Sequence, residues 1–171
     1  EPPGAVRETP DAEAAMILSF VLNGRETRLK TEPDRRAVDL LREDLGLLGT
    51  KEGCGAGDCG ACSILLDGRL VLSCLLLAAQ LEGREVLTVE GLGTPETPHP
   101  IQEAFAALGA VQCGFCTPGM ILATAALLRK NPRPTREEAR QALSGNLCRC
   151  TGYARIVDAV LAAARAMRRK P

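Results

Sequence analysis

The sequence of 171 residues is poor in aromatic side chains, with no tryptophan, one tyrosine and three phenylalanines. Single-stranded nucleic acids are bound largely by stacking on aromatic rings, so this composition disfavours that class of ligand. The 21 basic residues equal the 21 acidic residues in number, and a net charge of zero favours neither nucleic acid nor a membrane surface. No apolar run approaches the roughly 18 residues of a membrane-spanning helix. We therefore expect no nucleic-acid partner and no membrane span.

The residue that the sequence has in excess is cysteine, with eight copies. An even number of cysteines can indicate disulfides, but disulfide scaffolds are usually short secreted chains without a sizeable core. This chain is 46% apolar and is long enough to bury a core of its own. Its cysteines also cluster in loops and are not spread to join distant segments. The pattern therefore favours metal binding over disulfides.

The N-terminal half has the pattern of a small sheet. Two strands are predicted over 16–22 and 25–31 because an Asn-Gly pair, a strong hairpin signal, lies between them. Residues 35–47 carry apolar side chains at helical spacing. A second hairpin is predicted within 63–74, turning at an Asp-Gly pair, and a last strand over 85–92. This order indicates an α+β unit in which one face of the sheet is covered.

The composition changes at residues 91–98, where prolines and glycines indicate a linker. Residues 99–171 have helical periodicity, which predicts four helices in a bundle. We divide the chain into a flexible N-terminal arm over 1–15, a sheet domain over 16–90, the linker and the helical domain.

Short capping signals mark the predicted helix ends. Thr117 is expected to cap the second helix, with a proline at its first position. Thr135 and Glu138 are spaced as a capping box at the start of the third helix, and Gly145 is expected to end it. His99, the only histidine, is expected to have a surface or capping role.

The first group of cysteines lies in the stretch KEGCGAGDCGAC. Cys54, Cys59 and Cys62 have the spacing C-x4-C-x2-C, and Cys74 follows after eleven residues. Zinc ribbons usually pair two C-x2-C knuckles around one ion, whereas this spacing is that of plant-type [2Fe-2S] proteins. Four glycines let the loop approach a bulky cluster closely and direct backbone N–H groups at its sulfurs. We predict a [2Fe-2S] site here, with a zinc loop as the alternative.

The second group has the spacing C-x2-C-x31-C-x-C and consists of Cys113, Cys116, Cys148 and Cys150. Taken alone, this spacing indicates only an ambiguous metal site. Cys113 and Cys116 come just before a predicted helix, whose N-terminal N–H groups favour thiolates and an anionic cluster. Beside the first group, the second is predicted to hold another cluster.

Three segments together resemble a known family. KEGCGAGDCGAC, VQCGFCTPGM and SGNLCRCTGY are similar to the small iron–sulfur subunit of the molybdenum hydroxylases, such as xanthine dehydrogenase, aldehyde oxidoreductase and carbon monoxide dehydrogenase. The resemblance covers residues 16–166 and all eight cysteines. It implies a plant-ferredoxin-like β-grasp domain followed by a four-helix bundle, each with one [2Fe-2S] cluster.

The resemblance also implies partners and a direction of electron flow. A large chain would hold a molybdenum–pterin cofactor, and a further chain would hold FAD, giving a heterotrimer that could dimerise. Gln112 and Cys150 match positions that contact the pterin in relatives, and the cluster of Cys54 would face the flavin. The expected function is relay of single electrons from the pterin to the flavin or another acceptor, with no catalytic residue on this chain.

Three rivals and two open questions remain at this stage. A free-standing two-cluster carrier has the same clusters, whereas succinate dehydrogenase type subunits carry further C-x2-C-x2-C-x3-C-P runs that are missing here. The third rival is a non-redox zinc module that binds partner proteins. The substrate is left open because the large chain would recognise it. We expect a cytoplasmic location because cluster assembly needs reduced thiols, with periplasmic export of a folded complex as the alternative.

Overall fold

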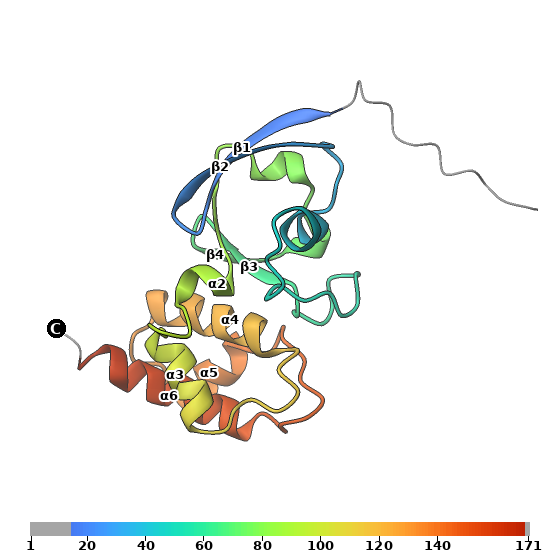
Figure 1. Ribbon diagram of the computed structural model, residues 1–171. Helices are drawn as coiled ribbons and strands as arrows, with labels where there is room; N and C mark the ends of the chain where they lie inside the picture. The colour runs from blue at the N-terminus through green and yellow to red at the C-terminus, as the bar shows by residue number, and fades with distance from the viewer. Residues whose placement is uncertain (1–14, 170–171) are drawn as a thin grey trace, which may run out of the picture.

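A computed structural model of the chain describes residues 15–169, and it is drawn in Figure 1. Apart from Ala15, the expected N-terminal arm lies outside the described residues. The sheet half occupies the upper part of Figure 1 and the helices α3 to α6 the lower part. Across the described residues, no helix combines the length and apolar character needed to cross a bilayer.

The sheet has five strands in the order β2-β1-β5-β3-β4. Strands β1 (Met16–Leu22) and β2 (Arg25–Thr31) form the predicted antiparallel hairpin. Strands β3 (Ser63–Leu66) and β4 (Arg69–Leu72) form the second predicted hairpin. Strand β5 (Glu85–Leu87) lies between the hairpins, parallel to β1 and antiparallel to β3.

One helical segment covers the sheet. Helix α1 (Ala37–Asp39) continues into the π-helical turn η2 (Leu40–Asp44). Together they span 37–44, which is shorter than the helix predicted within 35–47. Their apolar residues share a buried cluster with side chains of β1, β3 and β5. Two short 3₁₀ turns, η3 (Ser73–Leu75) and η4 (Ala78–Leu81), complete this half.

The strand predicted over 85–92 is wrong in its second part. Strand β5 ends at Leu87, and helix α2 (Val89–Leu92) follows. The backbone N–H of Thr88 donates to Asn23 Oδ1 at 2.8 Å, so a side chain takes the donor that a longer ladder would need. The Asn23 side chain thereby ends the strand.

The helical half contains α3 (Pro100–Ala107), α4 (Thr117–Lys130), α5 (Arg136–Ala142) and α6 (Ala154–Met167). His99 caps α3 by accepting the N–H of Ile101 at its Nδ1. The capping box of Thr135 and Glu138 at the start of α5 is confirmed.

Two predicted caps are wrong. Cys116, not Thr117, is the N-cap of α4, because the Met120 N–H already donates to the Cys116 carbonyl and draws Thr117 into the helix. Gly145 is not a left-handed cap, since its φ is not positive and α5 ends at a right-handed Leu143. Gly145 instead lies against the first cysteine loop.

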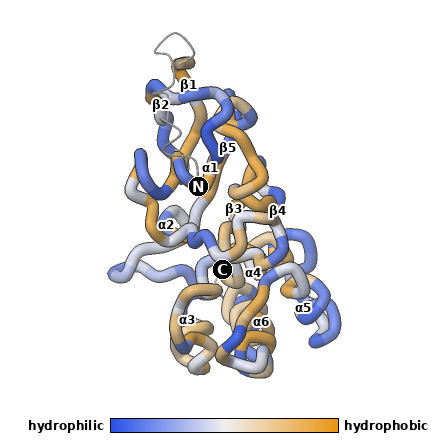
Figure 2. Tube along the Cα trace, turned by 90° about the vertical axis from the view of Figure 1, so that its right-hand side faces the viewer, coloured by the Kyte–Doolittle hydropathy of each residue, from blue (hydrophilic) through white to orange (hydrophobic). Residues whose placement is uncertain are grey.

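Strand β3 joins the two halves. Its side chains alternate between the two sides of the sheet, so Ile64 and Leu66 enter the core of the sheet half while Leu65 enters the core of the helical half. Figure 2 shows hydrophobic segments in both halves. The expected α+β fold is confirmed as a ferredoxin-like part with a mixed sheet, followed by a helical part.

Candidate metal centres

The first four thiols come from the glycine-rich loop and from the 3₁₀ turn η3, and they lie as two contacting pairs. Cys54 and Cys59 contact each other through their side chains, as do Cys62 and Cys74. Cys54 is exposed, whereas Cys62 and Cys74 are buried against Val38. The structure therefore brings together all four cysteines of the first predicted site, with one pair near solvent and one pair inside.

Backbone N–H groups point at the outer sulfur. The N–H groups of Ala56 and Asp58 donate to Cys54 Sγ at 3.4 and 3.3 Å. These donors lower the pKa of Cys54 to about 7, because they stabilise the thiolate. Burial raises the pKa of Cys74 to about 11. The loop itself is thus arranged for negative charge at its outer end, while the inner end needs a positive partner.

Gly57 illustrates why this loop is rich in glycine. It has φ +86°, a left-handed conformation that a residue with a side chain rarely adopts. A Cβ placed there would also lie 2.6 Å from Leu75 Cδ1. The loop can fold back over Leu75 and the neighbouring Cys74 only because this side chain is missing.

The second four thiols lie in two turns, one before α4 and one before α6. Cys113 and Cys150 are exposed and their Sγ atoms are 3.5 Å apart. Cys116 and Cys148 are half-buried and also contact each other. The structure therefore gathers all four cysteines of the second predicted site as well, again as an exposed pair and an inner pair.

The charge pattern of the second quartet resembles that of the first. Burial raises the pKa of Cys116 to about 12. The backbone N–H of Phe115 lowers the pKa of the exposed Cys113. Contact with Cys113 raises the pKa of Cys150. For Cys148, burial favours a higher pKa, but hydrogen bonds from Thr151 oppose it and the pKa is lowered on balance. Four thiolates crowded in this way need a cationic centre between them.

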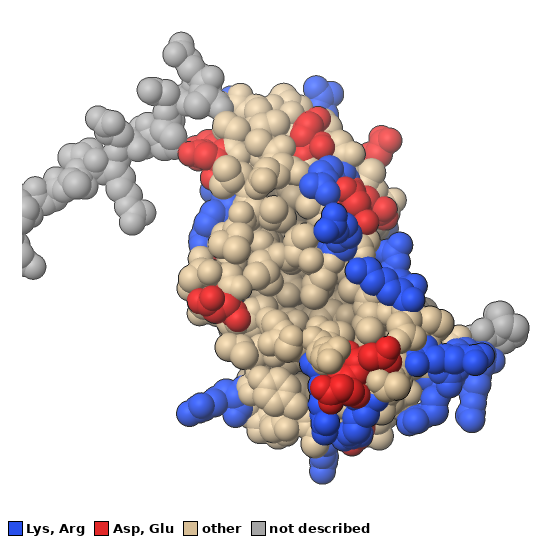
Figure 3. All heavy atoms as spheres, turned by 180° about the vertical axis from the view of Figure 1, so that it is seen from behind, with Lys and Arg blue, Asp and Glu red and all other residues tan. Residues whose placement is uncertain are grey.

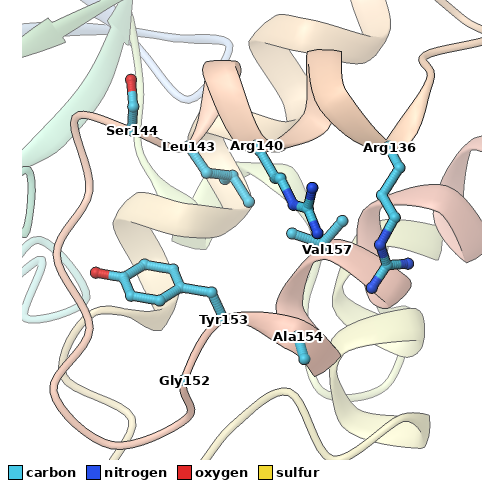
Figure 4. Close-up of a pocket in the computed structure, with 8 residues that line it drawn as sticks. All are labelled: Arg136, Arg140, Leu143, Ser144, Gly152, Tyr153, Ala154 and Val157. Atoms are coloured by element: carbon cyan, nitrogen blue, oxygen red, sulfur yellow. The ribbon is translucent and has the colours of Figure 1, made fainter.

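Tyr153 holds the turn that carries Cys148. Its hydroxyl accepts the backbone N–H of Cys148 at 2.7 Å, and Thr151 Oγ1 lies 3.1 Å from Cys148 Sγ. Tyr153 has φ +68°, which is strained for a bulky residue. In Figure 4 its ring extends from the start of α6 along the wall of a cavity of about 290 Å³, and its hydroxyl points away from Arg136 and Arg140.

The donor sets fit two-iron clusters better than single ions. All eight cysteines are free thiols, so disulfides do not compete. A structural zinc ion needs four donors at about 2.0 to 2.3 Å from one centre, whereas a [2Fe-2S] cluster spreads four thiolates over two irons. The paired thiols match the second requirement.

Known families match both halves of the chain. Residues 20–88 match the family described as 2Fe-2S iron-sulfur cluster binding domain, and residues 88–161 match the [2Fe-2S] binding domain family. The nicotinate dehydrogenase small FeS subunit of Eubacterium barkeri is 52% identical over 145 residues, which cover 85% of this chain and 92% of that protein. These matches decide the family.

The chain belongs to the small iron–sulfur subunits of the molybdenum hydroxylases. This subunit is also 51% identical over 149 residues to the xanthine dehydrogenase iron-sulfur-binding subunit of Escherichia coli O157:H7, covering 85% of this chain and 92% of that one. In the crystal structure of quinoline 2-oxidoreductase from Pseudomonas putida 86, a chain with 47% identity superposes with a TM-score of 0.87, covering 92% of this chain and 98% of that one.

The family confirms the function class expected from the sequence. The subunit has two [2Fe-2S]-binding domains and serves electron transfer in an oxidoreductase. The assignment of single residues, including Gln112 as a pterin contact, stays a prediction. Gln112 is exposed beside Cys113 in the structure.

Sequence reasoning missed two groups of residues around the site. Arg36 pairs with Glu52 at 2.6 Å and with Asp39 at 2.7 Å, which ties the first cysteine loop to α1. Asn146 links the two cysteine loops through hydrogen bonds. No local pattern marks the Arg36–Glu52 pair or the contacts of Asn146, because these partners lie 16 to 86 residues apart in the sequence.

The Tyr153 hydroxyl gives a first test. In Tyr153→Phe the Cys148 N–H loses its acceptor, and a lost hydrogen bond in a half-buried turn costs about 1 kcal/mol. We expect the EPR signal of the second reduced cluster to shift or broaden while that of the first stays unchanged. Identical signals for both clusters in the variant and the unaltered chain would contradict the role given to Tyr153.

Proposed function

We propose that this subunit takes electrons one at a time from a molybdenum–pterin centre on a large partner chain and passes them on through its two cysteine quartets. The quartet of Cys113, Cys116, Cys148 and Cys150 would receive them, and the quartet of Cys54, Cys59, Cys62 and Cys74 would deliver them to an FAD subunit or another acceptor. The observation that carries the proposal is the pairing of thiols in both quartets, each with one pair nearer to solvent than the other.

Residues of this chain hold the clusters and limit access to them. When bound, a [2Fe-2S] cluster accepts and releases one electron at a time. The eight thiolates would ligate the irons. The N–H groups of Ala56 and Asp58 are placed to stabilise sulfur charge at the first quartet, and Tyr153 and, in the complex, Phe115 would shield the second quartet from water. Such hydrogen bonds and burial are the means by which a protein sets a cluster's potential.

The surroundings of the second quartet support a large partner there. Val111, Phe115 and Leu147 are 38, 46 and 56% exposed and lie within three residues of Cys113 or Cys148. Large apolar side chains gathered at an exposed site indicate an interface. Gln112 is exposed in the same segment, and its amide could offer both donors and an acceptor to a pterin ring. Cys150, one of the two exposed thiols of this quartet, would be the second pterin contact.

A second exposed apolar group lies at the first quartet. Leu48, Leu75 and Leu77 are exposed near the first cysteine loop, and Cys54 is the exposed thiol there. This group supports a separate partner face for an FAD subunit. Figure 3 shows broad uncharged areas on the rear of the molecule, with the charged side chains in separate groups, as expected for a chain that is largely covered in its complex.

The full assembly would be a heterotrimer, itself able to dimerise. Within it we keep the division into an arm (1–15), a ferredoxin-like domain (16–90), a linker (91–98) and a helical domain (99–171). The shared core of α3, α4, α5 and α6 supports describing the last as a four-helix bundle. We place the complex in the cytoplasm, where thiols are reduced, with export in the folded state as the alternative.

The substrate would be recognised by the large chain. The relatives named above are parts of enzymes for nicotinate, xanthine and quinoline. Chains of closely similar sequence thus serve different substrates, so the small subunit does not set the choice. The second candidate is a free-standing two-cluster carrier. It would not explain why the large apolar side chains of Phe115 and Leu147 are exposed.

Single-cysteine variants test the two ligand sets. Cys54→Ser should remove the EPR signal of one reduced cluster and Cys150→Ser that of the other, because hard serine oxygens are poor substitutes for thiolates. The remaining cluster in each variant is the internal control for folding. Loss of both signals in each variant, or of neither, would overturn the division into these two quartets.

Substitution in the apolar surface at the second quartet tests whether a large partner chain binds there. Natively purified chain should elute in size exclusion with a larger molybdenum-containing chain, and Phe115→Asp should abolish this co-elution because it places a charge in a dry interface. Ile17→Asp, on an equally exposed apolar residue of β1, is the matched control. A native chain that elutes alone would favour the free-standing carrier.

A further inference from the structure

The two cysteine loops touch through their backbones. The N–H of Leu147 donates to the carbonyl of Cys59 at 2.9 Å. Cys59 belongs to the first quartet, and Leu147 directly precedes Cys148 of the second. One hydrogen bond and one peptide unit therefore connect Cys59 to Cys148, a predicted ligand of each centre, although the two cysteines are far apart in the sequence.

Asn146 fastens this contact. The residue is 2% exposed, and its Nδ2 donates to the Gly60 carbonyl at 2.8 Å and to Ser63 Oγ at 3.2 Å. The Ser63 hydroxyl donates to the same Gly60 carbonyl at 2.8 Å. One amide from the helical half thus uses both of its hydrogens on the end of the first cysteine loop. Such a buried, satisfied network specifies one arrangement of the groups that it joins.

The glycines around Asn146 allow the close approach. Gly60 has φ +71°, and a Cβ on it would collide with the Gly145 carbonyl and lie 2.6 Å from Asn146 Nδ2. A Cβ on Gly119, in the first turn of α4, would collide with the Gly60 carbonyl and lie 2.9 Å from Asn146 Nδ2. Backbones from three segments therefore meet around one side chain, and no larger residue fits at these positions.

We infer that Asn146 is a positioning residue that fixes the separation and mutual orientation of the two cysteine quartets. The inference rests on the proposed electron relay, since electron transfer between two centres falls off steeply with their distance. The contact of Leu65 with the helical core brings the halves together, but apolar contacts are not directional. The hydrogen bonds of Asn146 are directional and act at the cysteine loops themselves.

An asparagine suits this place for chemical reasons. Its amide has two donor hydrogens, and both acceptors lie on the other loop. An aspartate would set a carboxylate against the Gly60 carbonyl and could donate nothing while ionised. Leucine has the branching of asparagine but no donor and a larger volume, so Asn146→Leu removes both hydrogen bonds and adds bulk, whereas Ser63→Ala removes one of them without added bulk.

The test measures the magnetic coupling between the two clusters. The full chain, loaded with iron and sulfide, is reduced with dithionite until both clusters are paramagnetic, and EPR records their dipolar splitting, which falls with the cube of their distance. We expect a smaller and broader splitting in Asn146→Leu, and electron exchange between the clusters slowed several-fold. Ser63→Ala, which removes one acceptor from Asn146 and one donor to Gly60, should change the splitting in the same direction but less.

Asn131→Leu is the matched control. Asn131 also makes a side-chain hydrogen bond, to the Arg133 N–H at 3.0 Å, but it lies beyond the far end of α4. Its variant should keep the splitting of the unaltered chain. If Asn146→Leu does not fold, Ser63→Ala carries the test. Amide hydrogen exchange at Leu147 in the iron-loaded chain gives a second reading, and it should be faster in Asn146→Leu and Ser63→Ala than in Asn131→Leu.

The outcomes separate the inference from the function on which it rests. Two intact clusters with an unchanged splitting in Asn146→Leu and Ser63→Ala would overturn the positioning role alone. An unaltered chain that takes up no iron would overturn the proposed function instead.

Discussion

Each half of this subunit has to hold four sulfur ligands close together against their mutual repulsion. Burial raises the pKa of the inner thiols of Cys74 and Cys116, and contact with a neighbouring thiol adds to this, so both tend to stay protonated. Iron supplies the missing positive charge, but an oxidised [2Fe-2S] centre with four thiolates still carries about two negative charges. The chain stabilises this negative charge with backbone N–H groups, which donate to the sulfurs and need no counter-ion.

This requirement explains the form of the two loops. Backbone N–H groups can surround a cluster only where side chains are absent, so the first loop is rich in glycine and turns over Leu75 at Gly57. The second site instead uses the turns that precede two helices, with Tyr153 holding the Cys148 backbone. Both sites keep one pair of thiols near solvent and the other pair at least partly buried. A carrier of electrons between proteins needs this arrangement, since each centre must be near a partner surface and yet out of water.

Sequence patterns predicted most of the fold because most of its signals are local. The turns at Asn23-Gly24 and Asp67-Gly68 and the capping box at Thr135 involve residues within three positions of one another, and the structure has all of them. The predictions failed where residues far away in the sequence determine the local structure. Strand β5 ends early because Asn23 takes the Thr88 N–H, and Gly145 packs on Gly60 instead of ending a helix. Cysteine spacing predicted the two quartets, but the pairing within each depends on how the loops fold. Asn146 left no signal, because its acceptors are more than eighty residues away.

The account depends on iron bound to thiols, and chemical analysis tests that directly. The full chain, purified without oxygen, should contain about four iron atoms and about four acid-labile sulfides, two of each for every cluster. Zinc in place of iron, or iron without acid-labile sulfide, would contradict the account.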